Sequence, residues 1–298
     1  MLRAVICLSL ASAAASATVL PNLPAKRNGN VRLLALRGGN APTPKQNYLA
    51  YANKGAATAG MEAPKALLAS FHSGLQVGFG GLLAITVAAG VTGLDIVERR
   101  FVFGAVFPYI MFVILGSGGQ LYTGNTASVT SAYLEGLIPL PKLWRALGLA
   151  LAGNLAGCVA FAAIAKVAGI ISPAAGELAA TWAAKKISSP AGLVFLKAIL
   201  CNWLVCLAIL LTGLSQDVTG KILASYFPIA AFIILGLEHS VANACMLPIG
   251  LFGGAPISWR EIVTKNLVPV AVGNALGGAI LVAASYSYIF GKLGDNES

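Results

Sequence analysis

Charged residues are scarce in this chain: they make up 10% of its 298 residues, while apolar residue types reach 57%. Soluble domains carry about 25% charged residues, so this composition excludes an ordinary soluble protein and indicates a membrane protein. A membrane-spanning helix needs about 20 mostly apolar residues. Six windows meet that need, at 70–94, 101–137, 143–171, 191–214, 219–252 and 264–290. They leave no room for a soluble catalytic domain, and a lipid bilayer is the expected surrounding.

Acidic residues are absent from the first 61 residues, which hold seven of the twenty Lys and Arg. This leader therefore supplies most of the net charge of +10, and no nucleic-acid partner is expected. Residues 1–17 have a basic start, a short apolar core and a small-residue end, which is typical of a secretory signal peptide. Residues 18–61 are predicted to be a basic transit-like or disordered segment. Together they favour a plastid envelope location, with the plasma membrane as the alternative.

Cysteine and histidine are also few, at five and two residues. Four of the cysteines lie in the apolar windows without the spacing of a metal site: Cys158, Cys201, Cys206 and Cys245. We expect them to be small buried side chains, and we expect neither a metal ion nor a cofactor.

The chain contains an internal repeat, because a shift of 120 residues aligns three successive segments with themselves. The aligned residues are Phe107-Pro108 with Phe227-Pro228, Ile114-Leu115-Gly116 with Ile234-Leu235-Gly236, and Gly153-Asn154 with Gly273-Asn274. Each copy holds three spans, so the second copy enters the membrane in the opposite sense. The prediction is an all-α membrane protein of six transmembrane helices in two inverted three-helix repeats, in which the second helix of each repeat is broken.

Pairs of glycines four residues apart occur in three of the predicted spans. They are Gly74/Gly78, Gly153/Gly157 and Gly273/Gly277, and the last two pairs lie at equivalent repeat positions. Such pairs predict helices whose backbones approach closely.

Both broken spans are interrupted by glycine and small polar residues, from Gly116 in the first half and Gly236 in the second. Irregular backbone at that depth survives only inside protein or beside a wet cavity. The second break carries Glu238 and His239, whereas a shift of 120 places glycines at the equivalent positions. Ionisable groups inside a membrane usually mark a pathway. The alternative is a structural histidine that binds backbone groups. For Glu238 two roles stay open, orienting His239 or binding backbone.

Four motifs, GQLYTGN, LCNWLVCLAI, GLEHSVANACMLPIGL and NLVPVAVGNALGGAILV, resemble those of the formate–nitrite transporter family. The resemblance covers about residues 65–290, so residues 62–298 are interpreted as its membrane domain. It implies an aquaporin-like protomer, a homopentamer with one pore per protomer, and transport of small monovalent anions such as formate, nitrite, hydrosulfide or lactate. It implies no enzyme activity.

The resemblance also assigns pore residues. The substrate pore is implied to contain His239, Thr123, Asn202, Glu238 and Asn243. Bulky side chains are implied at an inner constriction, Phe107, Met111 and Phe232, and at an outer one, Leu121 and Val205. Lys186 is implied to attract anions at the outer mouth. Many members carry an acid where this chain has Gln120, which alters the expected field on that side.

These residues suggest a mechanism in which the anion is neutralised halfway. Transfer of an unpaired ion from water into a low-dielectric medium has too high a free-energy cost for the bare anion to cross. Histidine has an unperturbed pKa of about 6.5 and exchanges protons near neutral pH. We therefore hypothesise that His239 hydrogen-bonds or protonates nitrite or formate, so that the acid form passes the apolar rings. A plastid location favours nitrite, whereas a plasma-membrane location leaves formate or lactate equally open.

Two other classes compete with this interpretation. An aquaporin-like channel for neutral solutes would normally carry paired Asn-Pro-Ala boxes at the two breaks, and neither break has one. An intramembrane hydrolase would use His239 with Ser240. Adjacent side chains rarely face one another, and the sequence has no nucleophile elbow.

Overall fold

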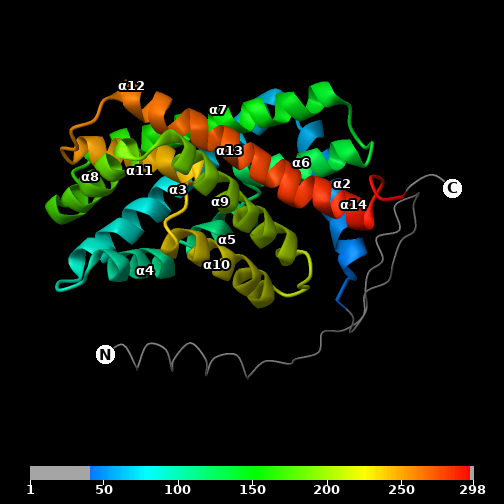
Figure 1. The fold of residues 1–298 in the computed structure, drawn as a ribbon, viewed down its shortest axis with the longest axis horizontal. Coiled ribbons are helices and arrows are strands. Elements are labelled where there is room, and N and C mark those ends of the chain that lie inside the picture. The colour runs from blue at the N-terminus through cyan, green and yellow to red at the C-terminus, as the bar shows by residue number, and fades with distance from the viewer. Residues whose placement is uncertain (1–40, 296–298) are drawn as a thin grey trace. The chain divides into compact units, whose positions relative to one another are not determined.

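The structure, a computed structural model, describes residues 41–295, so the predicted signal peptide lies outside the described residues. Within that range every regular element is a helix, which agrees with the predicted all-α class (Figure 1). In chain order they are α2 (Pro44–Gly60), α3 (Ala63–Gly90), α4 (Ile96–Val106), α5 (Tyr109–Gly116), α6 (Tyr122–Leu134), α7 (Leu140–Val167), α8 (Pro173–Ser188), α9 (Ala191–Thr212), α10 (Val218–Ile234), α11 (Ser240–Phe252), α12 (Trp259–Glu261), η2 (Ile262–Leu267), α13 (Val268–Gly278), η3 (Ala279–Ala284) and α14 (Ser285–Phe290).

Five helical stretches in the described range are long and apolar enough to cross a membrane. They are Ala63–Gly90, Ile96–Gly116, Leu140–Val167, Ala191–Thr212 and Trp259–Phe290. The predicted window 219–252 is instead divided between α10 and α11, two shorter apolar helices. The window 101–137 is divided in the same way before α6. Both divisions fall where the sequence predicts a break, while the inverted orientation of the two halves stays a prediction.

The glycine pairs lie where helices pack most closely. A Cβ added to Gly157 on α7 would collide with the Phe71 carbonyl oxygen on α3. A Cβ on Gly277 of α13 would collide with the Ile199 carbonyl oxygen on α9. The predicted close packing is therefore confirmed for both helix pairs, and in each case glycine is required by the backbone of the partner helix.

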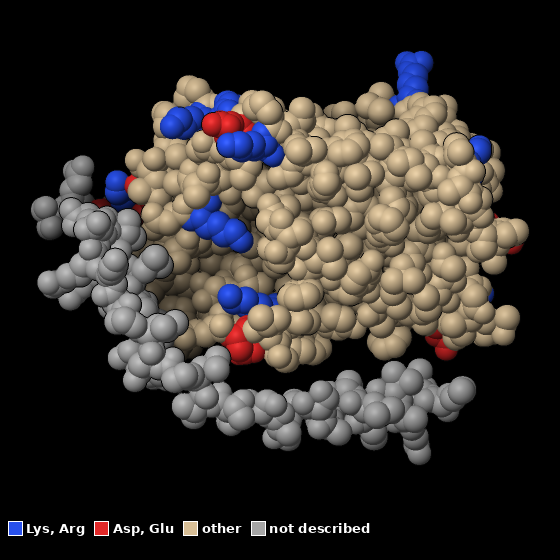
Figure 2. All heavy atoms as spheres, turned by 180° about the vertical axis from the view of Figure 1, so that it is seen from behind, with Lys and Arg blue, Asp and Glu red and all other residues tan. Residues whose placement is uncertain are grey.

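Large apolar side chains cover much of the outer surface. Val167 is 90% exposed, and Phe227 and Trp144 are about two-thirds exposed. Figure 2 shows a face that is almost entirely uncharged, with Lys, Arg, Asp and Glu limited to a few places. Contiguous apolar surface of this extent is unfavourable in water and is suited to lipid or to another subunit.

Helix α2 shows that residues 44–60, part of the segment predicted to be transit-like or disordered, form an ordered helix. Thr43 and Gln46 form a capping box at its start, and its buried face packs against α6. The Tyr48 hydroxyl donates to the buried Glu135 at 2.8 Å, and the Ser287 hydroxyl of α14 donates to the same oxygen. The boundary predicted at residue 62 therefore moves to before Pro44. The low hydropathy of this short helix hid it from a search for spans.

Helix α8 is the second element that the sequence did not predict. It fills the connection between the windows 143–171 and 191–214, and it packs against α11. Ser172 caps its first turn and Pro173 takes the first helical position. Its last turn carries Lys185 and Lys186.

Candidate functional site

The two broken spans end in the same way. Gly118 and Gly236 adopt positive φ angles of 74° and 68° directly after the helix end. Backbone N–H groups then bind carbonyls of the last turn, as in a Schellman motif: Gly119 to Ile114 at 2.9 Å and Leu237 to Phe232 at 3.0 Å. A few extended residues follow before the next helix begins, so each break places a new helix N-terminus within a span.

Asn154 of α7 holds the first break. Its side-chain oxygen accepts the Tyr122 N–H at 2.8 Å, and its nitrogen donates to the Gln120 carbonyl at 2.9 Å and the Ser70 carbonyl at 2.8 Å. The side chain is fully buried. One carboxamide thus satisfies the Tyr122 N–H and the Gln120 carbonyl, for which the helix ladder offers no partner.

Asn274 of α13 does the same at the second break. It accepts the Ser240 N–H at 2.8 Å and donates to the Glu238 carbonyl at 3.0 Å and the Ala198 carbonyl at 2.8 Å. It is also fully buried. The shift of 120 therefore aligns two residues with the same structural role.

Inside the breaks, however, the register differs from the sequence prediction. The shift of 120 pairs His239 with Gly119, whereas the structure pairs it with Leu121, because each is the N-cap of the helix after the break. Glu238 pairs with Gln120, because both carbonyls are bound by the repeat asparagines. The shift here is 118, since the second half has two more residues before its asparagine. Neither first-half equivalent is ionisable, so the Glu-His pair is still specific to the second break.

His239 is buried at the start of α11, where its ring has a fixed hydrogen bond. The Ala242 N–H donates to Nδ1 at 3.1 Å, and the ring stacks on Phe232 with centroids 5.4 Å apart. Because Nδ1 accepts this bond, a neutral ring carries its hydrogen on Nε2. The side chain therefore offers one N–H donor for a ligand, and it also has the structural role of a helix cap.

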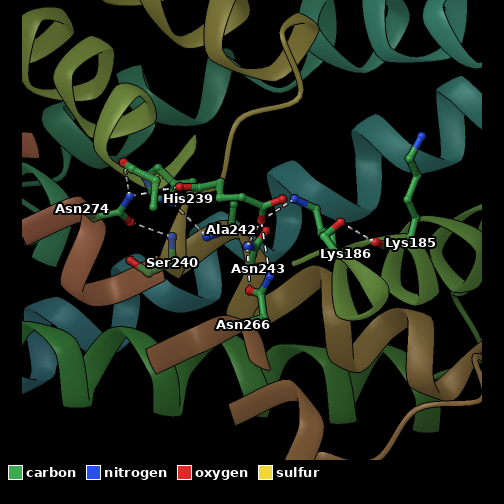
Figure 3. Close-up of polar contacts among 11 residues, drawn as sticks. Lys185, Lys186, His239, Ser240, Ala242, Asn243, Asn266 and Asn274 are labelled. Carbon is green, nitrogen blue, oxygen red and sulfur yellow. Dashed lines mark hydrogen bonds and ion pairs between the residues drawn. The ribbon is translucent and has the colours of Figure 1, made fainter. Parts of the chain in front are cut away.

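Within residues 41–295, the Glu238 carboxylate makes no hydrogen bond to His239 or to the backbone. Its Oε2 accepts from Lys186 Nζ at 2.8 Å, from Asn243 Nδ2 at 2.6 Å and from Asn266 Nδ2 at 3.4 Å. Figure 3 shows these three side chains meeting at one carboxylate, with Lys186 reaching in from α8. The Glu238 side chain is 5% exposed and that of Lys186 is 25% exposed. The ion pair is therefore largely buried, and only its cation reaches the surface.

Asn202 and Thr123, two predicted pore residues, are brought together. The Asn202 side-chain nitrogen donates to the Thr123 carbonyl at 3.2 Å and to Thr126 Oγ1 at 2.8 Å, and it also binds the Asn274 carbonyl. The Thr123 hydroxyl and the Asn202 side-chain oxygen are buried without a hydrogen-bond partner among the described residues. Two such atoms are expected where a ligand or water enters. Asn274 links this pair to the break at His239.

A cavity of about 120 Å³ opens beside His239. Phe107, Phe232 and Lys186 line it together with Glu238. Three further basic residues line it that the sequence reasoning did not select: Arg100, Lys185 and Lys197. The Lys185-Lys186 pair next to a predicted span was the available signal for this basic mouth.

A second cavity, of about 40 Å³, lies at the first break. Leu121 and Met111 line it together with Gln120, Asn125 and Lys54. Sequence reasoning missed Asn125 and Lys54. The first stands in the motif GQLYTGN, and the second lies in the segment taken as a leader.

These cavities group the constriction residues differently from the prediction. Met111 lies with Leu121 and not with Phe107, because Phe107 is the C-cap of α4 and Met111 belongs to α5, beyond Pro108. Lys186 lies on the side of Phe107, since α8 brings it there. Val205 is fully buried and lines neither cavity.

Comparisons with known proteins identify the family of the chain. The family model described as Formate/nitrite transporter matches residues 45–288. The chain is 37% identical over 246 residues to the "Probable formate transporter" of Methanothermobacter thermautotrophicus, covering 76% of this chain and 89% of that protein. It is 33% identical over 223 residues to "Nitrite transporter NirC" of Salmonella typhimurium, covering 74% and 81%.

Two solved structures have a similar fold. One is titled "FNT family ion channel", with a TM-score of 0.75 and 30% identity over 82% of this chain and 98% of that chain. The other is titled "Pentameric formate channel with formate bound", with a TM-score of 0.68 and 24% identity over 77% and 98%.

Proposed function

The chain belongs to the formate/nitrite transporter family, and we propose that it carries nitrite or formate across a membrane past His239. The family is one of transporters and channels and not of enzymes. The observation that carries the proposal is the position of His239. It is a buried donor at a helix N-terminus, stacked on Phe232 and lining a cavity with Lys186.

Each group at this site has a physical task. Lys186 and its basic neighbours attract an anion to the mouth. Phe107 and Phe232 form an apolar passage that a hydrated ion does not enter. The anion must therefore leave its water and find another partner, and the Nε2–H of His239 supplies a hydrogen bond at that point.

Proton transfer from His239 needs a second step. If the neutral ring gave up its Nε2 proton, an imidazolate would remain, which is too basic to form near neutral pH. We propose that Nδ1 first takes a proton from hydronium in the water of the adjoining cavity and releases the Ala242 N–H. The imidazolium then passes the Nε2 proton to the anion, which crosses as the acid, and a neutral ring remains.

Substitution of His239 tests the proposal in proteoliposomes. His239→Phe removes both the cap and the donor, and we expect uptake of nitrite and formate to fall by about tenfold or more. His239→Asn keeps a cap and a donor but cannot titrate. We expect this variant to fold and bind while losing the acid-stimulated part of uptake. Unchanged rate and pH dependence in both variants would reject the proposed role of His239.

Net current in a voltage-clamped bilayer separates the two modes of transport. A bare anion carries current, whereas an anion that crosses with a proton does not. We propose symport, and a current equal to the chemical flux would show the channel mode instead.

Assembly and location are proposed from the same resemblance. A solved structure of similar fold is described as pentameric, and this chain has extensive exposed apolar surface for subunit contacts. We propose a homopentamer. The acid-free leader supports a plastid envelope location and nitrite as substrate. Imaging of the fluorescently tagged leader in an algal cell tests this location, and a signal at the plasma membrane would contradict it.

A further inference from the structure

The two breaks are equivalent in backbone but differ in how their polar side chains are used. At the second break, Asn243 and Lys186 both donate to the Glu238 carboxylate. Asn243 follows its N-cap residue by four positions, and Asn125 follows Leu121 by the same interval. Asn125 is therefore the equivalent of Asn243, as Gln120 is of Glu238.

At the first break, no described acidic side chain accepts a hydrogen bond from the equivalent polar groups. Among the described residues, no hydrogen-bond partner holds the side chain of Gln120 or Asn125, and no acid pairs with Lys54. All three line the cavity beside Leu121, and Lys54 is the one charged residue among the described residues that line it. Partial burial and the nearby Lys221 ammonium lower the pKa of Lys54. An anion would relieve that repulsion.

The cavity is also placed for loading. It shares Lys54 and Tyr51 with a larger cavity of about 460 Å³ that also has Lys221 in its wall. On its other side stands Leu121, the N-cap of the helix after the break. An anion can thus move from a wide basic entrance to a small polar site directly before an apolar side chain.

We propose that Lys54, Gln120 and Asn125 form a binding subsite for a small planar oxyanion at the first break. This subsite rests on the proposed function, since it would load the same path from the α2 side. The ammonium supplies charge, and the two carboxamides donate N–H groups to the two oxygens of a carboxylate or nitrite. At the second break the equivalent donors already bind Glu238, so His239 is the donor that remains for the anion there.

Gln120→Glu tests the subsite, because a carboxylate at this position would bind Asn125 and Lys54 as Glu238 binds Asn243 and Lys186. We expect the half-saturating concentration of formate on the α2 side to rise about fivefold, with less than about a twofold change on the other side. Lys54→Met should raise the same quantity, because it removes the ammonium that attracts the anion.

Orientation in the vesicle is read from Asn53→Cys on the exposed face of α2 with an impermeant maleimide, since the cysteines of the described residues are buried. Gln46→Glu is the matched control. It makes the same change on α2, keeps the capping box and lines neither cavity. It should leave both sides unchanged.

Equal effects of Gln120→Glu on the two sides, or none, would overturn the subsite. The thermal stabilisation of the detergent-purified protein by formate at fixed ionic strength gives a second measurement. It should be smaller in Gln120→Glu than in the wild type, and equal stabilisation would count against the subsite. If wild-type vesicles take up neither anion, the proposed function fails, while the stabilisation still reports on the subsite.

Discussion

At the scale of single residues, the Glu238–Lys186 pair shows how charge is tolerated inside this protein. The carboxylate is almost inaccessible and accepts from three donors, whereas the lysine is partly exposed. Burying an ion pair has a desolvation cost that attraction repays only when further hydrogen bonds are present. Asn243 and Asn266 supply those bonds. The pair therefore keeps a cation beside the cavity without leaving an unpaired acid next to an anion path.

Removing the lysine and removing the glutamate should lower the stability of the protein by different amounts. Lys186→Met leaves a buried carboxylate without its cation, and we expect a loss of about 2–4 kcal/mol of stability. Glu238→Gln leaves a lysine that can turn to water, and we expect about 1 kcal/mol. Unfolding in detergent can be followed with a thiol-reactive dye, because Cys158, Cys201, Cys206 and Cys245 are all buried and free.

The double variant completes this comparison. If the cost lies in the unpaired carboxylate, Lys186→Met combined with Glu238→Gln should be more stable than Lys186→Met alone. A double variant that is as unstable as the sum of the single ones would show that the two residues are not coupled, and would contradict the explanation by an unpaired carboxylate.

At the scale of helices, the sequence predicted what depends on length and composition. The long apolar windows mark the spans, and glycine marks both the breaks and the closest contacts. Helices α2 and α8 were not predicted, because they are short and weakly apolar and depend on tertiary packing. The register at the breaks was wrong by two residues, since a constant shift cannot detect a connection that is longer in one half.

The residues of the site also divide into those that the sequence could predict and those that it could not. His239 and Glu238 could be selected because ionisable groups are conspicuous in an apolar span. Of the glutamate's three partners, Lys186 and Asn243 were named only through the family resemblance and Asn266 was not named, because they come from α8, α11 and η2 and no local pattern connects them. Lys54 was missed because its helix was taken for part of a leader.

Helix packing gives a prediction with an internal control. Gly157 and Gly148 lie on the same helix, α7, but a Cβ at Gly148 would meet nothing within 4 Å. Gly157→Leu should cost on the order of 3 kcal/mol or more or prevent folding, because it separates α7 from α3. Gly148→Leu should be neutral or slightly stabilising, since leucine favours helix by about 0.8 kcal/mol. The melting temperatures of the two variants in detergent test this, and equal destabilisation would contradict it.

At the scale of the whole molecule, much of the surface is apolar, and we expect lipid or other subunits to cover it. We expect the purified protein to have about five times the mass of one protomer, as measured by light scattering with the detergent contribution subtracted. Substitutions in the cavities should leave this mass unchanged, because the cavities lie inside one chain. A monomer that still transports would contradict the pentamer without affecting the pore.

The two repeat asparagines have a consequence for redesign. The side chains of Asn154 and Asn274 hold the breaks through main-chain atoms alone, so this part of the support does not depend on which side chains the breaks carry. New side chains could therefore be introduced at the two breaks on the existing main chain, provided that a residue at position 239 still caps α11 and a residue at position 238 still pairs with Lys186 and Asn243.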